Sequence, residues 1–412
     1  MKNIQINSSR LWHSLMKMAE IGATEKGGCR RLTLTDLDRK GRDLFVRWCE
    51  DAGCEVTVDI IGNIFASRPG KDLNRMPVMA GSHLDTQPTG GRFDGVLGVL
   101  AALEVVRTLN DHSVETDAPI EICCWTNEEG SRFAPAMMGS GVFAGIFDID
   151  EILAKEDIDG VRLGDELVRI GYAGDAPVNG HKPESYFELH IEQGPILEAE
   201  ENTIGVVTAA QGQRWYEITV TGQESHAGPT PMARRKDALV AASVIVGEVN
   251  RIGHAYPPNA CATVGFMQVS PNSRNVIPGS VFLTVDFRHP DNDTLSDMDS
   301  KIKAFCTQIV DDTGVEVDVV DFWHFPPTPF DEDCIAAVRE GAVAHGYDHM
   351  DIVSGAGHDA VYLNSVAPTG MIFIPCEDGI SHNETENASP RDCAAGCNVL
   401  LHAVLERAEK TA

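Results

Sequence analysis

The fold is decided by the stretch Val78-Met-Ala-Gly-Ser-His83 and by the residues that follow it as far as position 109. Residues 78–83 form a short apolar run that ends in turn residues, which is typical of a buried strand. The segment Asp85-Thr-Gln-Pro-Thr-Gly-Gly-Arg-Phe-Asp94 is rich in turn formers and predicts a loop. From Gly95 to Leu109 apolar residues recur every three or four positions, which predicts a helix. With a further strand at 120–125, this is the repeating unit of a mostly parallel sheet flanked by helices.

The rest of the chain predicts a second, differently built domain inside the first. The apolar runs at 186–191 and 371–374 are further strands of the parallel type. Between them the pattern changes to strands at 214–221, 263–269, 280–287 and 315–322, with helices at 237–249 and 301–310. This order is typical of helices layered on an antiparallel sheet. We therefore predict an α/β fold in which residues 1–212 and 330–412 form one domain and residues 213–329 are inserted.

Composition excludes several classes of function. The formal net charge of −29 argues against nucleic acid as a partner, because phosphate binding needs a basic face. No apolar stretch is long enough to span a membrane, and the N-terminal segment has no hydrophobic signal core. The eleven cysteines include no C-x-x-C pair, which favours reduced thiols over a disulfide framework. We expect a cytoplasmic protein without nucleic-acid or membrane partners.

Five side chains of the kinds that bind metals come shortly after predicted apolar runs. In an open α/β sheet, ligands collect outside the carboxyl ends of the strands. Imidazole and carboxylate groups that converge there would form a two-metal hydrolytic site. The residues are His83, Asp94, one member of the pair Glu128–Glu129, His190 and His382.

Nine short motifs follow one another between residues 81 and 383. They are Gly-Ser-His83-Leu-Asp85-Thr, Gly-Gly-Arg-Phe-Asp94-Gly-Val-Leu-Gly, Thr-Asn-Glu128-Glu129-Gly-Ser-Arg-Phe, Glu-Leu-His190-Ile-Glu-Gln193-Gly-Pro, Ser-His226-Ala-Gly, Arg-Asn275-Val-Ile-Pro-Gly, Asp-Phe-Arg288-His, Gly-Ala-Gly-His358-Asp359-Ala and Gly-Ile-Ser-His382-Asn. In this order they resemble the M20 group of dinuclear zinc hydrolases. More narrowly, they resemble its amidase branch of N-carbamoyl-L-amino-acid hydrolases, β-ureidopropionases and allantoate amidohydrolases. The resemblance implies a metallo-exopeptidase-like catalytic domain with an inserted ferredoxin-like lid and dimerisation domain.

The resemblance also assigns the metal ligands. His83 and His190 would bind one ion, Glu129 and His382 the other, and Asp94 would bridge the two. These ligand types suit Zn²⁺ first, and also Mn²⁺, Co²⁺ or Ni²⁺. Two ions roughly 3.5–4 Å apart can activate one water molecule near neutral pH.

Catalytic roles follow from the same resemblance. Glu128 would be the general base, which takes a proton from the attacking water and passes it to the leaving nitrogen. Asp85 would orient the imidazole of His83. His226 would stabilise the oxyanion, reaching in from the other subunit of a homodimer.

The resemblance implies substrate contacts for three more residues, and three others remain open. Arg288 would hold a substrate carboxylate with its planar guanidinium. Asn275 and Gln193 would bind the polar ends of the substrate. His358 could contact the substrate or only begin a helix. Gln213 and Arg214 could line the site or simply begin a strand.

The resemblance predicts an amidohydrolase that splits the ureido C–N bond of an N-carbamoyl amino acid, either N-carbamoyl-L-amino acids or N-carbamoyl-β-alanine. Allantoate remains an alternative, because it shares a ureido group and a carboxylate with these substrates. A dinuclear aminopeptidase or dipeptidase is a second alternative. It is disfavoured by His190, since related peptidases often carry a carboxylate there. A protein that only binds a metabolite is disfavoured because it would have no need of Glu128.

Overall fold

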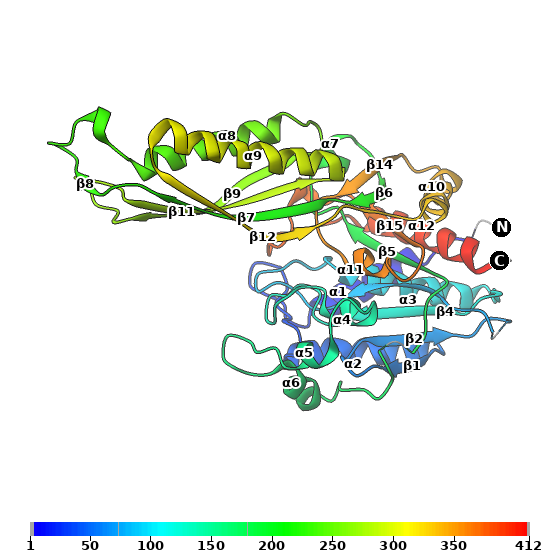
Figure 1. The fold of residues 1–412 in the computed structure, drawn as a ribbon. Helices are drawn as coiled ribbons and strands as arrows, with labels where there is room; N and C mark the ends of the chain where they lie inside the picture. The colour runs from blue at the N-terminus through cyan, green and yellow to red at the C-terminus, as the bar shows by residue number, and fades with distance from the viewer. Residues whose placement is uncertain (1–3, 73, 179, 410–412) are drawn as a thin grey trace. The chain divides into compact units, whose positions relative to one another are not determined.

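The computed structural model describes residues 4–72, 74–178 and 180–409 and contains two compact units (Figure 1). Unit 1 consists of residues 1–208 and 330–412, and unit 2 of residues 209–329. Each unit has its own cluster of buried apolar side chains. None of the helices in the described ranges is long and apolar enough to cross a membrane.

Unit 1 is built on a mixed sheet whose centre is parallel. The strand order is β1-β2-β4-β3-β5-β15-β6, with β14 also paired to β6. The neighbours β4, β3, β5 and β15 run parallel, while β1, β2 and β6 are antiparallel to their neighbours. The strands are β1 (Glu55–Val58), β2 (Ile64–Arg68), β3 (Val78–His83), β4 (Ile120–Trp125), β5 (Ser185–Ile191), β6 (Ile204–Ala210), β14 (His349–Ser354) and β15 (Thr369–Ile374).

Helices flank this sheet, as the sequence predicts. The helix α3 is buried along almost its whole length, because it packs on β3 and β5 and is covered by α1 and α12. This explains why its sequence is apolar on nearly every face. The helices are α1 (Ser8–Ala19), α2 (Asp36–Asp51), α3 (Val96–Asp111), α4 (Met138–Phe143), α5 (Ile149–Leu153), α6 (Leu163–Ile170), α7 (Ile196–Ala199), α10 (Glu332–His345), α11 (Asp359–Leu363), α12 (Pro390–Glu409) and the 3₁₀ turn η2 (Glu377–Gly379).

Unit 2 is a four-stranded antiparallel sheet of order β12-β7-β11-β9, with α8 and α9 on one face (Figure 1). Alternate residues of β7, such as Tyr216 and Ile218, are buried under the helices, whereas Trp215 and Glu217 face the other way. A separate ribbon of β8 and β10 extends this unit, and β13 pairs with the end of β6. The elements are β7 (Gly212–Thr221), β8 (Ser225–His226), η1 (Met232–Arg234), α8 (Ala238–His254), β9 (Cys261–Ser270), β10 (Val276–Ile277), β11 (Ser280–His289), α9 (Asn292–Thr313), β12 (Glu316–Phe325) and β13 (Thr328–Pro329).

Candidate metal centre

The carboxyl ends of the central strands of unit 1 bring the predicted ligands together. His83 is the last residue of β3, His190 lies next to the end of β5, and Glu129 follows β4. Asp94 closes the loop before α3, and His382 follows β15. The strands β4, β3, β5 and β15 are parallel neighbours, so their carboxyl ends share one edge of the sheet.

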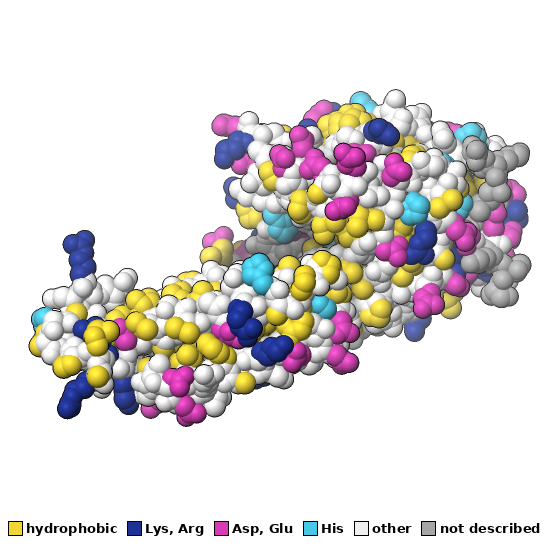
Figure 2. Space-filling model, turned by 90° about the horizontal axis from the view of Figure 1, so that it is seen from above, with side chains coloured by type: hydrophobic (Ala, Val, Ile, Leu, Met, Phe, Trp, Pro, Cys, Tyr) yellow, Lys and Arg dark blue, Asp and Glu magenta, His cyan; other side chains and the backbone are white. Residues whose placement is uncertain are grey.

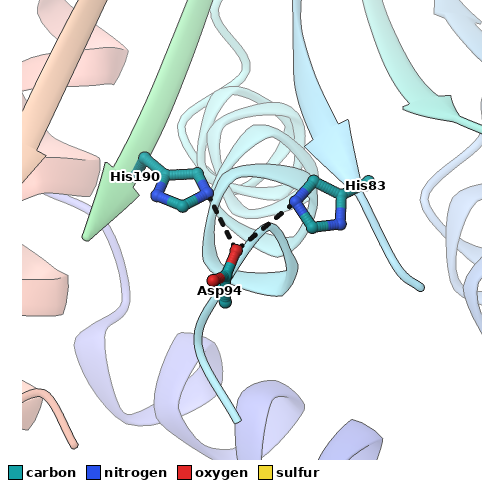
Figure 3. A group of neighbouring side chains, drawn as sticks. All are labelled: His83, Asp94 and His190. Carbon is teal, nitrogen blue, oxygen red and sulfur yellow. Dashed lines mark ion pairs between the residues drawn. The ribbon is translucent and has the colours of Figure 1, made fainter. Parts of the chain in front are cut away.

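Three of these residues form a buried triad (Figure 3). One carboxylate oxygen of Asp94, Oδ1, lies 3.5 Å from Nε2 of His83 and 3.2 Å from Nε2 of His190. All three residues are at most 5% exposed. Gly95, whose φ is +66°, follows Asp94, and a Cβ atom at this position would lie 2.3 Å from the His83 ring. Only glycine therefore allows the loop to place Asp94 so close to His83.

Both imidazoles are oriented by the main chain. Nδ1 of His83 lies 2.9 Å from the carbonyl oxygen of Asp85, and Nδ1 of His190 lies 2.9 Å from that of Ile191. A carbonyl can only accept a hydrogen bond, so each Nδ1 carries a proton. When the ring is neutral, its lone pair is therefore on Nε2. This tautomer is the one that binds a metal through Nε2.

A second triad shares Asp94. Its other oxygen, Oδ2, lies 3.5 Å from Nε2 of His382, and the same nitrogen lies 3.5 Å from Oε2 of Glu129. Asp94 thus turns one oxygen to each triad, as a bridging carboxylate does. His382 has a φ of +53°, a rare conformation for a residue with a side chain, which indicates that the local structure holds it there.

The charge of the site fits cations. Glu128, Glu129 and Asp94 are gathered within a buried region, next to imidazole groups. Burial, together with neighbouring carboxylates, raises the pKa values of Glu128 and Glu129 well above their usual range. Burial opposes ionisation of Asp94, but His190 and His83 outweigh it and lower its pKa well below the usual range. Because buried carboxylates are usually paired or coordinate metals, this donor set suits divalent metal binding.

Asp85 contacts the His83 ring through its carbonyl oxygen and the main chain of the two glutamates through its carboxylate. Its carboxylate oxygen lies 3.8 Å from Nδ1 of His83, beyond hydrogen-bonding distance, and only its carbonyl orients that ring. The carboxylate instead accepts hydrogen bonds from the main-chain N–H groups of Glu128, at 3.3 Å, and Glu129, at 3.2 Å. Asp85 therefore fixes the turn that separates the two glutamates.

Glu128 is the carboxylate outside both triads. Its Oε2 lies 3.4 Å from Nε2 of His83, and the side chain is buried. The preceding residue, Asn127, has a φ of +56° and is held by hydrogen bonds from its amide to the carbonyl groups of Phe133 and Pro135. This turn sends the consecutive side chains of Glu128 and Glu129 in different directions.

Gln193 contacts the ligands themselves. Its amide nitrogen donates to Oδ2 of Asp94 at 2.8 Å and lies 3.4 Å from Nε2 of His382. His358 is also close, with its ring centroid 4.6 Å from that of His190 and its Nε2 hydrogen-bonded to Ser354 at 3.0 Å. Gln193 and His358 therefore lie beside the candidate metal ligands.

The remaining predicted residues belong to unit 2. His226 and Asn275 are neighbours. The strands β8 and β10 pair His226 with Val276. The carbonyl of Asn275 accepts a hydrogen bond from the main-chain N–H of Ala227. Both side chains are exposed. Arg288 lies near the far end of β11, where its guanidinium donates to Asp286 at 2.9 Å.

Arg214 points away from Arg288. It sits 3.4 Å from the carboxylate of Asp299 and bonds to Ser296, both on α9, so it belongs to the helix-covered face of the sheet. Gln213, which pairs with Arg288 across β7 and β11, lies on the opposite face. Of these two candidates, Gln213 therefore shares a face of the sheet with Arg288, and Arg214 does not.

Two supporting residues were absent from the sequence analysis. Glu386 is buried and accepts hydrogen bonds from the N–H groups of Phe93 and Asp94, at 3.0 and 3.1 Å. Gln87 donates to Oε2 of Glu129 at 2.6 Å. In the sequence, the one hint of a role for Glu386 is that it lies four residues after His382. That spacing does not by itself indicate a contact with Asp94.

Comparisons with known proteins show what this chain is similar to. Residues 79–406 match the family described as Peptidase family M20/M25/M40. The chain is 52% identical to an N-carbamoyl-L-amino-acid amidohydrolase of Rhizobium meliloti, over 99% of this chain and 98% of the relative. It is 32% identical to an allantoate amidohydrolase of Bacillus subtilis, over 93% of each protein. A crystal structure of a hydantoinase/carbamoylase family amidase from Burkholderia multivorans is 61% identical, with a TM-score of 0.96, covering 99% of this chain and 100% of that one.

The matched region contains both triads and the adjacent Glu128. Its extent and the full-length similarity to these amidohydrolases confirm the family predicted from the nine motifs. The chain belongs to the M20/M25/M40 peptidase family.

Proposed function

We propose that this protein hydrolyses the ureido C–N bond of an N-carbamoyl amino acid. The observation that carries the proposal is the pair of triads that share Asp94, with Glu128 beside one of them. The relative that is 52% identical bears the name of this activity. The products would be an amino acid and carbamate, which decays to ammonia and carbon dioxide.

Two divalent ions, Zn²⁺ by preference, would occupy the triads. His83, His190 and Asp94 would hold one, and Asp94, Glu129 and His382 the other. When bound, such ions polarise a carbonyl group and make water acidic enough to react near neutral pH. They would also neutralise the buried carboxylates of this site.

Glu128 would move the proton. Its carboxylate would take a proton from the water that attacks the ureido carbon and would deliver it to the amino-acid nitrogen as the C–N bond breaks. Asp85 would keep this carboxylate apart from Glu129 by binding both main-chain N–H groups.

Arg288 would recognise the substrate carboxylate through two parallel hydrogen bonds. Asp286, which accepts from the same guanidinium, would hold it in place. Gln213 is the neighbouring polar side chain on this face, whereas Arg214 is engaged by α9. Asn275 would bind a polar end of the substrate. Gln193 and His358 would line the substrate site next to the metal-binding residues.

The separation of these groups within unit 2 supports a homodimer. Arg288 lies eight positions beyond Ser280 on β11, and Asn275 precedes Ser280 at the other end of that strand. At about 3.4 Å per residue, Ser280 and Arg288 lie roughly 27 Å apart. The ribbon that carries His226 and Asn275 lies beyond the Ser280 end of the sheet (Figure 1), so this pair and Arg288 are too far apart to hold one small substrate. We propose that His226 and Asn275 complete the site of a second copy, where His226 would stabilise the oxyanion.

The surface of unit 2 suits such an assembly. Its edge strand β9 is long, and Phe266 and Met267 on it are exposed. Val240 and Val244 on α8 are exposed as well, and Figure 2 shows hydrophobic side chains along this unit. We propose that unit 2 is the lid and dimerisation domain and that unit 1 is the catalytic domain. The eleven free cysteines support a reducing, cytoplasmic location.

The deciding experiment is ammonia release from a substrate panel by the purified protein. The panel contains several N-carbamoyl-L-amino acids, N-carbamoyl-β-alanine, allantoate and a dipeptide. Turnover of an N-carbamoyl amino acid above the others supports the proposal. Preference for allantoate would favour the alternative represented by the Bacillus subtilis relative. Cleavage of the dipeptide alone, followed by amine release, would contradict the proposal.

A further inference from the structure

The strands that carry two of the proposed metal ligands separate just before those ligands. β3 and β5 pair at Val78–Ala80 and Ser185–Phe187, and within these described strands the pairing extends no further. Beyond that point β3 stays with β4 as far as His83, and β5 stays with β15 as far as Ile191. Main-chain hydrogen bonds between β3 and β5 therefore do not set the distance between His83 and His190.

The side chain of Glu188 spans this separation. It is fully buried, and its Oε1 accepts a hydrogen bond of 2.7 Å from the hydroxyl of Ser82, the neighbour of His83. Glu188 and His190 are two positions apart on β5 and so lie on the same face. One carboxylate thus links the end of β3 to the end of β5.

The other oxygen reaches a third element. Oε2 of Glu188 accepts a hydrogen bond of 2.9 Å from the main-chain N–H of Ala360. Ala360 lies at the start of α11, directly after His358 and Asp359. The hydroxyl of Tyr186 lies 3.2 Å from the same oxygen and accepts a hydrogen bond from the indole of Trp125, the last residue of β4. The carboxylate therefore connects the segments that carry His83, His190 and His358.

A direct metal role for Glu188 is less favoured. Ligand atoms of Glu188, His190 and His358 do lie within 4.8 Å of one another. However, both oxygens of Glu188 already accept hydrogen bonds, and Nε2 of His190 faces Asp94 at 3.2 Å. In the described structure its hydrogen-bond donors are hydroxyls and an amide, none of them a cation. Burying a carboxylate without a cationic partner costs free energy of folding, so the presence of Glu188 here needs an explanation beyond packing.

We propose that Glu188 is a positioning residue, which sets the spacing of His83 and His190 around Asp94 by bridging the separated ends of β3 and β5. This inference rests on the proposed function, because it assumes that a metal ion binds the first triad. Residues that orient metal ligands typically change metal affinity about 10–100-fold when they are removed.

The test is a Co²⁺ titration of the full-length protein after removal of bound metal, followed by visible absorption. Glu188→Ala removes all the bridges, and Ser82→Ala removes only the bond to β3. Glu188→Gln is the conservative variant, because its amide can accept from Ala360 and donate to Ser82. Glu121→Ala is the matched control: Glu121 is also buried and bonds to a serine of a neighbouring strand, Ser67, but does so on β2 and β4.

Glu188→Ala should weaken binding of one Co²⁺ ion about 10–100-fold and change its absorption spectrum. Ser82→Ala should do so to a smaller extent, while Glu188→Gln and Glu121→Ala should retain the wild-type spectrum. A folded Glu188→Ala protein with wild-type affinity and spectrum overturns the proposal. If that variant does not fold, an unchanged Ser82→Ala spectrum overturns it instead. Failure of the wild type to bind Co²⁺ at all would contradict the proposed function rather than this inference alone.

Discussion

Nε2 of His83 lies 3.4 Å from Oε2 of Glu128, so a proposed metal ligand and the proposed general base face each other. Asp94 approaches the same nitrogen at 3.5 Å from another direction. This nitrogen thus faces two carboxylates: Asp94, which belongs to both triads, and Glu128, which belongs to neither. In the proposed mechanism, this difference separates the ligand Asp94 from the base Glu128, although both are buried carboxylates.

Replacing Glu128 and Glu129 by glutamine, one at a time, should affect different properties of the protein. Glu128→Gln keeps the shape of the side chain but removes the base, so kcat should fall about 10²–10⁴-fold with metal content unchanged. Glu129→Gln should instead lower the affinity for the ion of the second triad. Steady-state kinetics with elemental analysis of both variants is the measurement. Exchange of these two phenotypes would reverse the assignment.

Removal of metal should abolish turnover. Asp94 lies in both triads, so exhaustive chelation should leave its two oxygens without cations. Adding back Zn²⁺, Mn²⁺ or Co²⁺ should restore activity, because imidazole and carboxylate ligands accept each of them. Full activity in a preparation shown by elemental analysis to be free of metal would contradict the dinuclear site.

Arg288 and Arg214 form a matched pair on opposite faces of one sheet. A lysine ammonium cannot reproduce the two parallel bonds of a guanidinium, so Arg288→Lys should lose most of kcat/KM for N-carbamoyl amino acids. Arg214→Lys, which alters a contact with Asp299 on α9, should leave kcat/KM nearly unchanged. Kinetics on the acid and on its amide, which lacks the carboxylate, tests this. Equal losses on both substrates for Arg288→Lys would indicate a structural role.

His226 should act across the dimer. Removing one donor to an oxyanion typically costs about 10²–10³ in kcat, so His226→Ala should be nearly inactive with its metal retained. Exchange of its subunits with Glu128→Gln subunits should restore some activity. The mixed dimer would contain one site with Glu128 from one chain and His226 from the other. Demonstrated exchange without recovery would show that His226 acts in its own chain or has no catalytic role.

Asp59 should make stability depend on pH. Its carboxylate, buried between β1 and β2, accepts two bonds of 2.8 Å from Asn63, and burial raises its pKa to about 7. Because the folded pKa lies above the unfolded value of about 3.9, its stabilising contribution is present below pH ~4 and is lost as the pH rises through ~7. Relative to Asp59→Asn, the wild type should therefore lose stability between pH 5 and pH 8.

Urea unfolding midpoints at both pH values measure this difference. Asp72→Asn, at an exposed position, serves as the control for the loss of one carboxylate. A constant difference between wild type and Asp59→Asn across this range would contradict the prediction.

Much of the parallel core could be predicted, because its strands are continuous apolar runs. The strands at 78–83 and 120–125 have the predicted bounds, and the helix predicted from Gly95 to Leu109 spans Val96–Asp111. The helix predicted at 301–310 is wrong in length, since α9 runs from Asn292 to Thr313. The N-cap of this helix is Asp291, whose side chain accepts a hydrogen bond from the N–H of Thr294. Because its first turns are rich in polar residues, the apolar periodicity did not reveal where the helix begins.

The sequence by itself determined the kinds of groups at the strand ends, because apolar runs and the turns after them are local patterns. Only the tertiary structure decided that α8 and α9 cover the face of Arg214, that the carboxylate of Asp85 binds the main chain of Glu128 and Glu129, and that Glu188 bridges β3 and β5. These contacts join residues far apart in the chain, so their geometry depends on packing that no local pattern encodes.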